Sequence, residues 1–330
     1  DFDALIYTNI APEHIEAHGG FEHYKAAKLR LFEGLGKLRH KVIEGEEIQK
    51  GIIVNLSDPH AEAFLACQAD KHYGFATTKT PPNLPLVRGG VFATDVHFTG
   101  SCTTFSVGDS TYHLKPIGRF YLENALAAMA TAKLLGVTQD VLQHAVESLE
   151  SVPGRLERIE EGQPFSVIVD YAYEPAALTA VYDTIKLIEH KRLIHIIGSA
   201  GGGRDVARRE ILGKMAAAHD DVVIVTNEDP YDEDPQTIID EVANAAEAAG
   251  KREMHSKSLQ ARLVVGVNLF KILDRGEAIQ HAIDLAEPHD LVLITGKGCE
   301  PVMAVADGKK ISWDDRLSAR KALHHRYAST

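Results

Sequence analysis

Short apolar runs alternate with amphipathic segments along the chain, a pattern typical of a parallel α/β sheet. The alternation is most regular in the second half, where each apolar run ends in a polar residue or a glycine. The strands predicted there are Val167–Asp170, Leu193–Gly198, Val222–Thr226, Phe270–Leu273 and Leu291–Thr295. The predicted helices begin near Pro175, Val206, Pro235, Arg275 and Asp314. These units predict a doubly wound sheet, and ligands bind such sheets at the carboxyl ends of the strands.

The first half shows the same alternation, interrupted by a group of shorter strands. The strands predicted for its main sheet are Ala4–Asn9, Gly51–Asn55 and Tyr73–Thr77. Short antiparallel strands joined by Gly and Asp turns are predicted at Val91–Phe98, Thr103–Val107 and Tyr112–Leu114. Helices are predicted at Pro59–Gln68, at Phe120–Leu135 and from Thr138 to about Ser148. Pro153 and Gly154 interrupt the pattern, so residues 1–153 and 154–330 are predicted to form two domains. The stretch Lys251–Val267 gives no clear pattern.

Composition excludes several classes of protein. The chain has 330 residues and a net charge of −12, without a basic stripe that would neutralise nucleic-acid phosphates. Its three scattered cysteines do not predict a disulfide framework, which favours a reducing compartment. No apolar run reaches the roughly 18 residues of a membrane span, and no signal peptide is visible. We therefore expect a cytoplasmic, monomeric protein that binds neither nucleic acid nor membrane. Because the chain begins at Asp1 without methionine, we also expect further sequence upstream.

An acid and an imidazole, Glu13 and His14, follow the first predicted strand, and Lys28 lies on the next predicted helix. A lysine on an alanine-rich helix face is most often simply solvated. A lysine amine held near a divalent cation, however, can take up carbon dioxide. The carbamate that forms is an anionic oxygen ligand, which suits Mg²⁺.

Two strand ends in the second half carry ligand-binding or capping groups. The Gly-Ser-Ala-Gly-Gly-Gly-Arg-Asp segment at 198–205 follows a strand and opens a helix, where backbone amides can hold an anion. A tight turn without a ligand explains it equally well, and it matches neither a Walker A loop nor a dinucleotide fingerprint. Asp170 can accept hydrogen bonds from a ribose, or it can cap the helix that begins at Pro175.

Further polar groups allow a structural and a ligand-binding interpretation. Asn124 is a poor helix former inside an alanine- and leucine-rich helix. Arg155 at the domain boundary suits either a surface ion pair or a phosphate. The loop at 226–235 is crowded with carboxylates, and the Gly-Lys-Gly-Cys-Glu segment at 296–300 follows the last apolar strand.

Taken in order, these segments resemble the Mur ligases, ATP-dependent enzymes that add amino acids to the cell-wall precursor. The first two segments are Thr-Asn-Ile-Ala-Pro-Glu-His at 8–14 and Tyr-Lys-Ala-Ala-Lys at 24–28. Together they are similar to the signature of the family's central domain. The other similar segments are Asn-Ala-Leu-Ala-Ala at 124–128, Pro-Gly-Arg at 153–155, Asp-Tyr-Ala at 170–172, the loops at 198–205 and 296–300, and Asp-Asp-Arg at 314–316. The resemblance implies the C-terminal part of a central ATP-binding domain at 1–153, followed by a Rossmann-like, amino-acid-binding C-terminal domain at 154–330.

The resemblance also implies roles for individual residues in binding ATP and Mg²⁺. Lys28 would be the carbamylated lysine, and His14 a ligand of the second magnesium ion. Asn124 would contact the adenine, Asp170 the ribose and Arg155 the γ-phosphate.

The incoming amino acid would be held by the second domain. The residues implied for this role are Arg204, Glu228, Asp229, Tyr231, Gly296 and Glu300. Tyr231 stands where the family carries an arginine that binds the distal carboxylate of diaminopimelate. We therefore expect a diamino acid, with L-lysine slightly favoured over meso-diaminopimelate. Family positions also differ at Tyr173, Glu174 and Cys299.

Within the family, the best match is to enzymes that add the third amino acid to UDP-N-acetylmuramoyl-L-Ala-D-Glu. The implied mechanism is phosphorylation of the D-glutamate carboxylate to an acyl phosphate, which the amine of the amino acid then attacks. Because the sequence contains no Walker A loop, we expect a fragment or a short homologue, inactive on its own. Three alternatives stay open: a folylpolyglutamate-synthase-like enzyme, a subunit of a wall-precursor amidotransferase, and a nucleotide- or amino-acid-binding module without catalysis.

Overall fold

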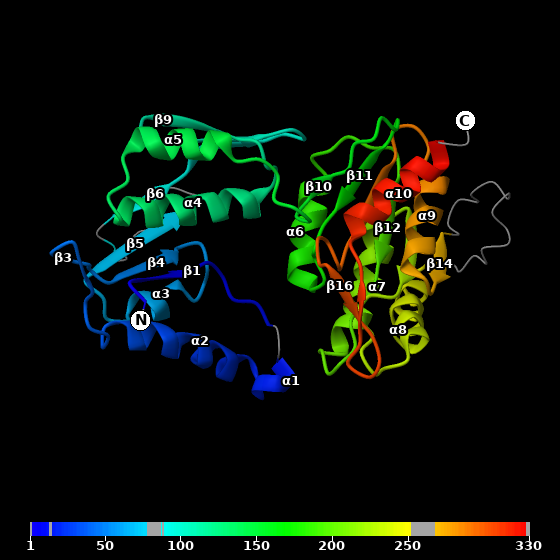
Figure 1. The fold of residues 1–330 in the computed structure, drawn as a ribbon, viewed down its shortest axis with the longest axis horizontal. Coiled ribbons are helices and arrows are strands. Elements are labelled where there is room, and N and C mark those ends of the chain that lie inside the picture. The colour runs from blue at the N-terminus through cyan, green and yellow to red at the C-terminus, as the bar shows by residue number, and fades with distance from the viewer. Residues whose placement is uncertain (1, 13–14, 78–86, 88, 252–267, 328–330) are drawn as a thin grey trace. The chain divides into compact units, whose positions relative to one another are not determined.

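The chain folds into two compact units, Asp1–Glu150 and Ser151–Thr330. The computed structural model describes all residues except 1, 13–14, 78–86, 88, 252–267 and 328–330 (Figure 1). The division falls close to the predicted boundary at Pro153. The predicted site residue His14 and most of the unpatterned stretch Lys251–Val267 lie outside the described residues.

The first unit is built on a parallel sheet with the strand order β1-β4-β5-β6. Its strands are β1 (Ala4–Tyr7), β4 (Gly51–Asn55), β5 (Lys71–Ala76) and β6 (Gly89–Phe92). Helices α2 (Phe21–Leu35) and α3 (Ala61–Leu65) lie on one side of the sheet, and α4 (Arg119–Leu134) lies on the other (Figure 1). Every residue of β4 is buried, as expected for a parallel strand that is covered on both faces.

A small antiparallel sheet completes the first unit. Its strands are β7 (Thr94–Phe98), β8 (Thr103–Val107) and β9 (Ser110–Leu114), and α5 (Gln139–Ser148) packs against β9. The prediction of a single strand at Val91–Phe98 is wrong. The segment forms the end of β6 and the whole of β7, which belong to different sheets and are separated by the buried Ala93. Three short elements were not predicted, namely α1 (Ile15–His18), β2 (Val42–Ile43) and β3 (Glu46–Glu47).

The second unit contains the doubly wound sheet that the sequence predicts. The order of its described strands is β10-β11-β15-β12-β13-β14, parallel except for the edge strand β10. The strands are β10 (Glu157–Arg158), β11 (Ser166–Val169), β12 (Leu193–Ile197), β13 (Val222–Thr226), β14 (Leu269–Ile272) and β15 (Leu291–Ile294). An additional hairpin is formed by β16 (Val302–Ala304) and β17 (Lys310–Ser312).

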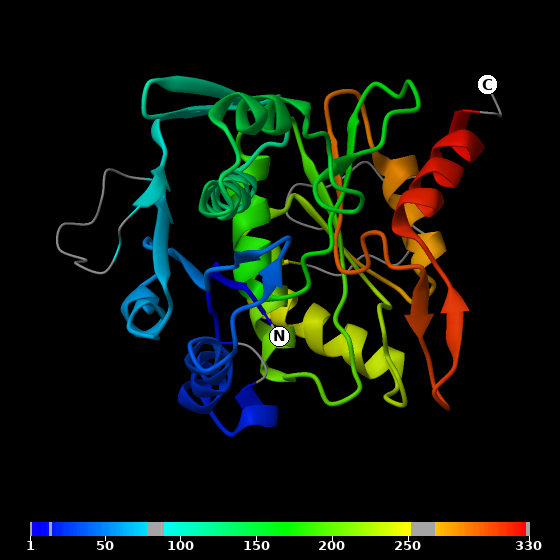
Figure 2. The same ribbon diagram turned by 60° about the vertical axis from the view of Figure 1, so that its left-hand side comes forward.

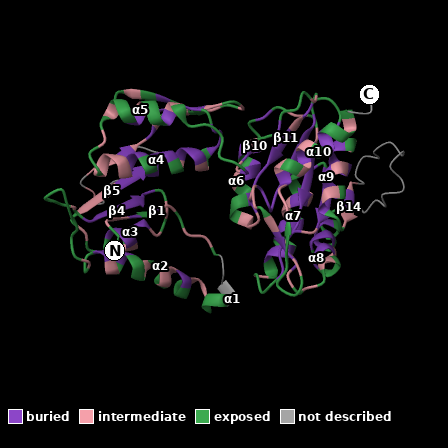
Figure 3. Ribbon diagram, in the orientation of Figure 1, coloured by how far each residue is buried: buried purple, intermediate pink, exposed green. Residues whose placement is uncertain are grey.

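Helices cover both faces of this sheet (Figure 2). They are α6 (Pro175–Ile185), α7 (Ala207–His219), α8 (Pro235–Ala248), α9 (Arg275–Leu285) and α10 (Asp315–Tyr327). One face packs against α9 and α10 in a single apolar core, while Tyr182 of α6 bonds to His195 on the opposite face. The buried residues concentrate along the strands and the inner sides of these helices (Figure 3). None of the described helices is long and apolar enough to cross a membrane.

Candidate functional site

The carboxyl end of β15 lies where the chain connections of the second sheet diverge. Strand β15 lies between β11 and β12. After β11 and β12 the chain continues into α6 and α7 on one face, whereas after β15 it continues into the hairpin and α10. Ligands bind doubly wound sheets at such switch points. The segment at 296–300 therefore occupies the position where a ligand is expected.

A buried lysine organises this end of the sheet. The Lys297 side chain is only 1% exposed, and its Nζ donates to both carboxylate oxygens of Asp229, at 2.9 and 2.8 Å. It also donates to Oε2 of Glu300, whose Oε1 accepts a 2.5 Å hydrogen bond from the Tyr171 hydroxyl. Burial alone would lower the pKa of Lys297, but the hydrogen bonds to Asp229 and Glu300 outweigh it and raise that pKa. The lysine is thus a fixed cation between two predicted substrate residues.

Glu228 is the most strongly perturbed carboxyl group of the site. Burial raises its pKa to about 7, against the opposing effects of Arg275 and Arg208. Its Oε2 has no hydrogen-bond partner among the described residues. Gly296 has a φ of 112°, and a Cβ there would lie 2.4 Å from Oε2 of Glu228. Glycine is therefore needed at 296, and a buried acceptor remains unused beside it.

The carboxylate-rich loop at 226–235 also explains why the segment at 198–205 contains several glycines. A Cβ on Gly201 would lie 2.4 Å from the Pro230 carbonyl oxygen, so these two loops pack backbone to backbone. The amides of Gly202 and Gly203 hydrogen-bond to Glu233, which lowers the pKa of that carboxyl group after the larger effect of Arg209. The anion held by this loop within the chain is thus the Glu233 carboxylate.

Three further predicted residues border these loops. Arg204 is exposed in the glycine-rich loop, and Tyr231 is half-buried with a positive φ of 52°. Asp229 accepts a 2.7 Å hydrogen bond from the Ala304 amide, which ties its loop to β16. Sequence reasoning missed the buried Arg208 and Arg209 of α7, which bond to Glu174, Glu233 and Glu241.

Asp170 and Arg155 lie on the other side of β15. Both Asp170 oxygens accept 2.7 Å hydrogen bonds, from the amides of Leu156 and Ala172. Burial raises the Asp170 pKa despite these bonds. Asp170 is not the cap of α6, because Glu174 occupies that position. The Arg155 guanidinium lies 4.3 Å from the centre of the Tyr171 ring, so it stacks on the residue that bonds Glu300.

The two predicted residues of the first unit that the structure describes, Lys28 and Asn124, are exposed. Lys28 lies on α2 with Nζ 4.8 Å from the Tyr24 ring centre, and Asn124 lies on the surface of α4. No group of three or more His, Cys, Asp or Glu side chains in the described part of the chain could hold a metal ion. The roles of Lys28, His14 and Asn124 stay predictions.

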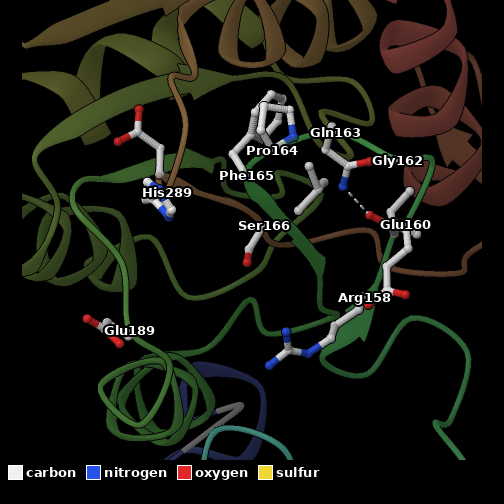
Figure 4. A pocket seen from close by; sticks show the side chains of 12 residues that line it. Arg158, Glu160, Gly162, Gln163, Pro164, Phe165, Ser166, Glu189 and His289 are labelled. Atoms are coloured by element: carbon white, nitrogen blue, oxygen red, sulfur yellow. Dashed lines mark hydrogen bonds between the residues drawn. The ribbon is translucent and has the colours of Figure 1, made fainter.

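A competing cavity lies at the opposite end of the second sheet. It has a volume of about 460 Å³ and is bordered by Arg158, Gln163, Ser166, Glu189 and His289 (Figure 4). It lies beside the amino end of β11, away from the predicted ligand-binding edge. In the described structure, the buried polar atoms that lack a hydrogen-bond partner do not border this cavity. One of them, Oε2 of Glu228, belongs to the candidate site instead. The carboxyl end of β15 is therefore the stronger candidate.

Comparison with known proteins identifies the class. Residues 1–132 match the model of the Mur ligase middle domain, and residues 154–298 match that of the Mur ligase glutamate ligase domain. The chain belongs to the Mur ligase family.

Its relatives point to one branch of that family. The chain is 36% identical over 328 residues to a UDP-N-acetylmuramyl-tripeptide synthetase of Roseiflexus sp., with 98% of the chain and 60% of the relative covered. It is 34% identical to a UDP-N-acetylmuramoyl-L-alanyl-D-glutamate–2,6-diaminopimelate ligase of Syntrophomonas wolfei, with the same coverage. A solved structure with this ligase name matches with a TM-score of 0.55 and 26% identity, over 98% of the chain and 61% of its own. The chain thus spans about 60% of the length of these curated relatives.

Proposed function

We propose that this chain is part of an ATP-dependent amide ligase of peptidoglycan precursor synthesis. The enzyme would add the third amino acid, a diamino acid, to UDP-N-acetylmuramoyl-L-Ala-D-Glu. Membership of the Mur ligase family and the activities that the relatives are named for support this proposal. The observation that carries it is the group of carboxylates around Lys297 at the end of β15. Carboxylates at a switch point suit a ligand with two ammonium groups.

Each residue of this group has a distinct part in the proposed mechanism. Lys297 donates hydrogen bonds to Asp229 and Glu300 and so fixes their positions, and the remaining lone pairs of their oxygens can accept hydrogen bonds from an ammonium group of the amino acid. Glu228, with a pKa of about 7, can take up a proton near neutral pH. An amine must lose a proton before it attacks an acyl group, and a nearby carboxylate favours that step.

The nucleotide contacts are part of the same proposal. ATP would supply the phosphoryl group that activates the D-glutamate carboxylate, with magnesium offsetting the charge. Arg155 would reach the γ-phosphate from its stacked position on Tyr171. Asp170 would contact the ribose through a remaining lone pair, since both of its oxygens already accept an amide hydrogen bond. Asn124 and a carbamylated Lys28, with His14, would serve the adenine and the metal.

The test uses the protein expressed from its complete coding sequence. It is incubated with UDP-N-acetylmuramoyl-L-Ala-D-Glu, ATP, Mg²⁺ and either L-lysine or meso-diaminopimelate. Phosphate release and the mass of the product are measured. A product heavier by one amino acid, formed together with phosphate, is the expected result.

The alternatives predict different products. A folate-type enzyme would extend a folyl glutamate instead, and an amidotransferase subunit would need a glutaminase partner. A binding module would give a binding isotherm without phosphate release. Any of these results, with the muramoyl dipeptide left unchanged, would refute the proposal.

A further inference from the structure

A buried ion pair joins the first residues of two helices in the second unit. Arg275 begins α9, Asp315 begins α10, and both side chains are 0% exposed. The Arg275 Nε donates to Oδ1 of Asp315 at 2.8 Å, and its Nη2 donates to Oδ2 at 2.7 Å. The pair is therefore bidentate, the strongest geometry for such a contact.

Three other hydrogen bonds of the pair go to the two loops of the candidate site, and the Trp313 indole donates one more to Oδ1 of Asp315 at 2.8 Å. Arg275 Nη1 donates to the Asn227 carbonyl at 3.3 Å, and Nη2 donates to the Thr295 carbonyl at 2.7 Å. The Gly298 amide donates to Oδ2 of Asp315 at 3.2 Å. Asn227 directly precedes Glu228 and Asp229, while Thr295 and Gly298 enclose Gly296 and Lys297. One ion pair thus holds the backbone of both loops.

Stability alone does not explain a pair of this kind. Removing two charges from water costs several kcal/mol per ion, and buried pairs can often be replaced by apolar residues without loss of stability. A cavity of about 380 Å³ borders Arg275, Asn227, Met303 and Trp313, so side-chain packing around the pair is incomplete on this side. The backbone hydrogen bonds of the pair hold the loops there.

We propose that Arg275 and Asp315 are positioning residues that set the spacing between the Glu228–Asp229 loop and the Gly296–Glu300 loop. In doing so they fix the distance between the carboxylates that receive the diamino acid. The identity of that ligand rests on the proposed function, whereas the positioning of the loops does not. An arginine is required because a lysine has no planar fork to reach Asp315 and two carbonyls together.

The experiment compares two double variants of the complete protein. R275M/D315L replaces the pair by apolar side chains of similar length. The matched control, R192M/D290L, removes another bidentate pair of the same sheet, at its amino end. Both variants are expected to stay folded, with a lower melting temperature for R275M/D315L, because the backbone groups bonded to the pair lose their partners.

Two readouts separate positioning from a purely structural role. The KM for the amino acid is expected to rise about tenfold or more in R275M/D315L, since displacement by about 1 Å can cost two orders of magnitude. Alkylation of Cys299, which follows Gly298 and is partly exposed, is expected to speed up. The modification is followed by peptide mass spectrometry, with Cys102 as internal reference. R192M/D290L is expected to change neither quantity.

The outcomes are distinct. A folded R275M/D315L protein with parental Cys299 reactivity and parental KM overturns the proposal. Faster alkylation with an unchanged KM overturns its link to the amino acid. Faster alkylation in a protein whose parent ligates no amino acid leaves the positioning intact and refutes the proposed function instead. If the double variant does not fold, R275K is judged by the same two measurements.

Discussion

Two lysines, one in each unit, show how differently the same residue type can serve a site. Lys28 lies exposed on α2, with its Nζ 4.8 Å from the centre of the Tyr24 ring. Lys297 is 1% exposed and held by Asp229 and Glu300. The chain itself determines where the Lys297 ammonium lies, whereas a role for Lys28 depends on ligands that it must recruit. Variants of Lys28 should therefore affect activity alone, and variants of Lys297 should affect folding as well.

The largest effect on activity is expected for Lys28→Ala in the complete protein. Loss of the carbamate would remove a metal ligand, so ligation should become undetectable, and added bicarbonate should not restore it. The melting temperature should stay unchanged, because exposed side chains away from special features contribute little to stability. Phosphate release and thermal unfolding measure the two quantities. Full activity in this variant would remove Lys28 from the proposed mechanism.

Lys297→Met should both abolish amino-acid binding and weaken the fold. Removing one partner of a buried ion pair leaves uncompensated charge and costs roughly 3–5 kcal/mol. Chemical denaturation of the complete protein, with Lys28→Met as matched control, measures the difference. If Lys297→Met lowers the free energy of unfolding no more than Lys28→Met does, water reaches Asp229 and Glu300 freely and Lys297 does not organise the site.

Glu228 should make the protein less stable as the pH rises. Its pKa is raised from 4.5 to about 7, so between these values the folded state binds more protons than the unfolded state. Stability is therefore lost from pH 4.5 to 7, by about 3 kcal/mol for this group if each pKa unit corresponds to about 1.4 kcal/mol.

Glu228→Gln removes the titration and isolates its contribution from those of Asp170 and Asp220, whose pKa values burial also raises. The stability of the variant relative to the parent should grow from pH 5 to pH 8 in denaturation curves. A constant difference would show that Glu228 is ionised throughout this range.

The contrast between the lysines also shows what a sequence can predict. Strands such as β12 and β13 were found because parallel strands buried on both faces appear as continuous apolar runs. Strand β17 was missed because all of its residues are exposed and its sequence has no apolar run. The confirmed doubly wound topology follows from such alternation.

Site residues were predicted where a motif marked them, and missed where burial gave them their role. Lys297 lies inside the Gly-Lys-Gly-Cys-Glu segment at 296–300, yet nothing in its residue type indicates that it is buried. Asp315 lies in the Asp-Asp-Arg segment at 314–316 and Arg275 resembles an ordinary first-turn helix residue, but nothing in the sequence indicates that the two pair across 40 positions. Such long-range contacts leave no local pattern in a single sequence.

The smallest effect concerns the choice of amino acid, which Tyr231 should influence. If Tyr231 takes the place of the family's arginine, as the resemblance implies, a distal carboxylate lacks its charged partner. Tyr231→Arg should raise kcat/KM for meso-diaminopimelate relative to L-lysine by about tenfold, since a hydrogen bond to a charged group contributes roughly 1.5–3 kcal/mol. Tyr231→Lys, a point charge without the planar fork, should give a smaller gain. Steady-state kinetics of the complete protein with both amino acids provide the ratio.

If the parent already prefers diaminopimelate a hundredfold, another group binds the distal carboxylate. The nearest candidate in sequence is the exposed Arg204. In that case selection of the amino acid would depend on the glycine-rich loop rather than on the loop that Lys297 anchors.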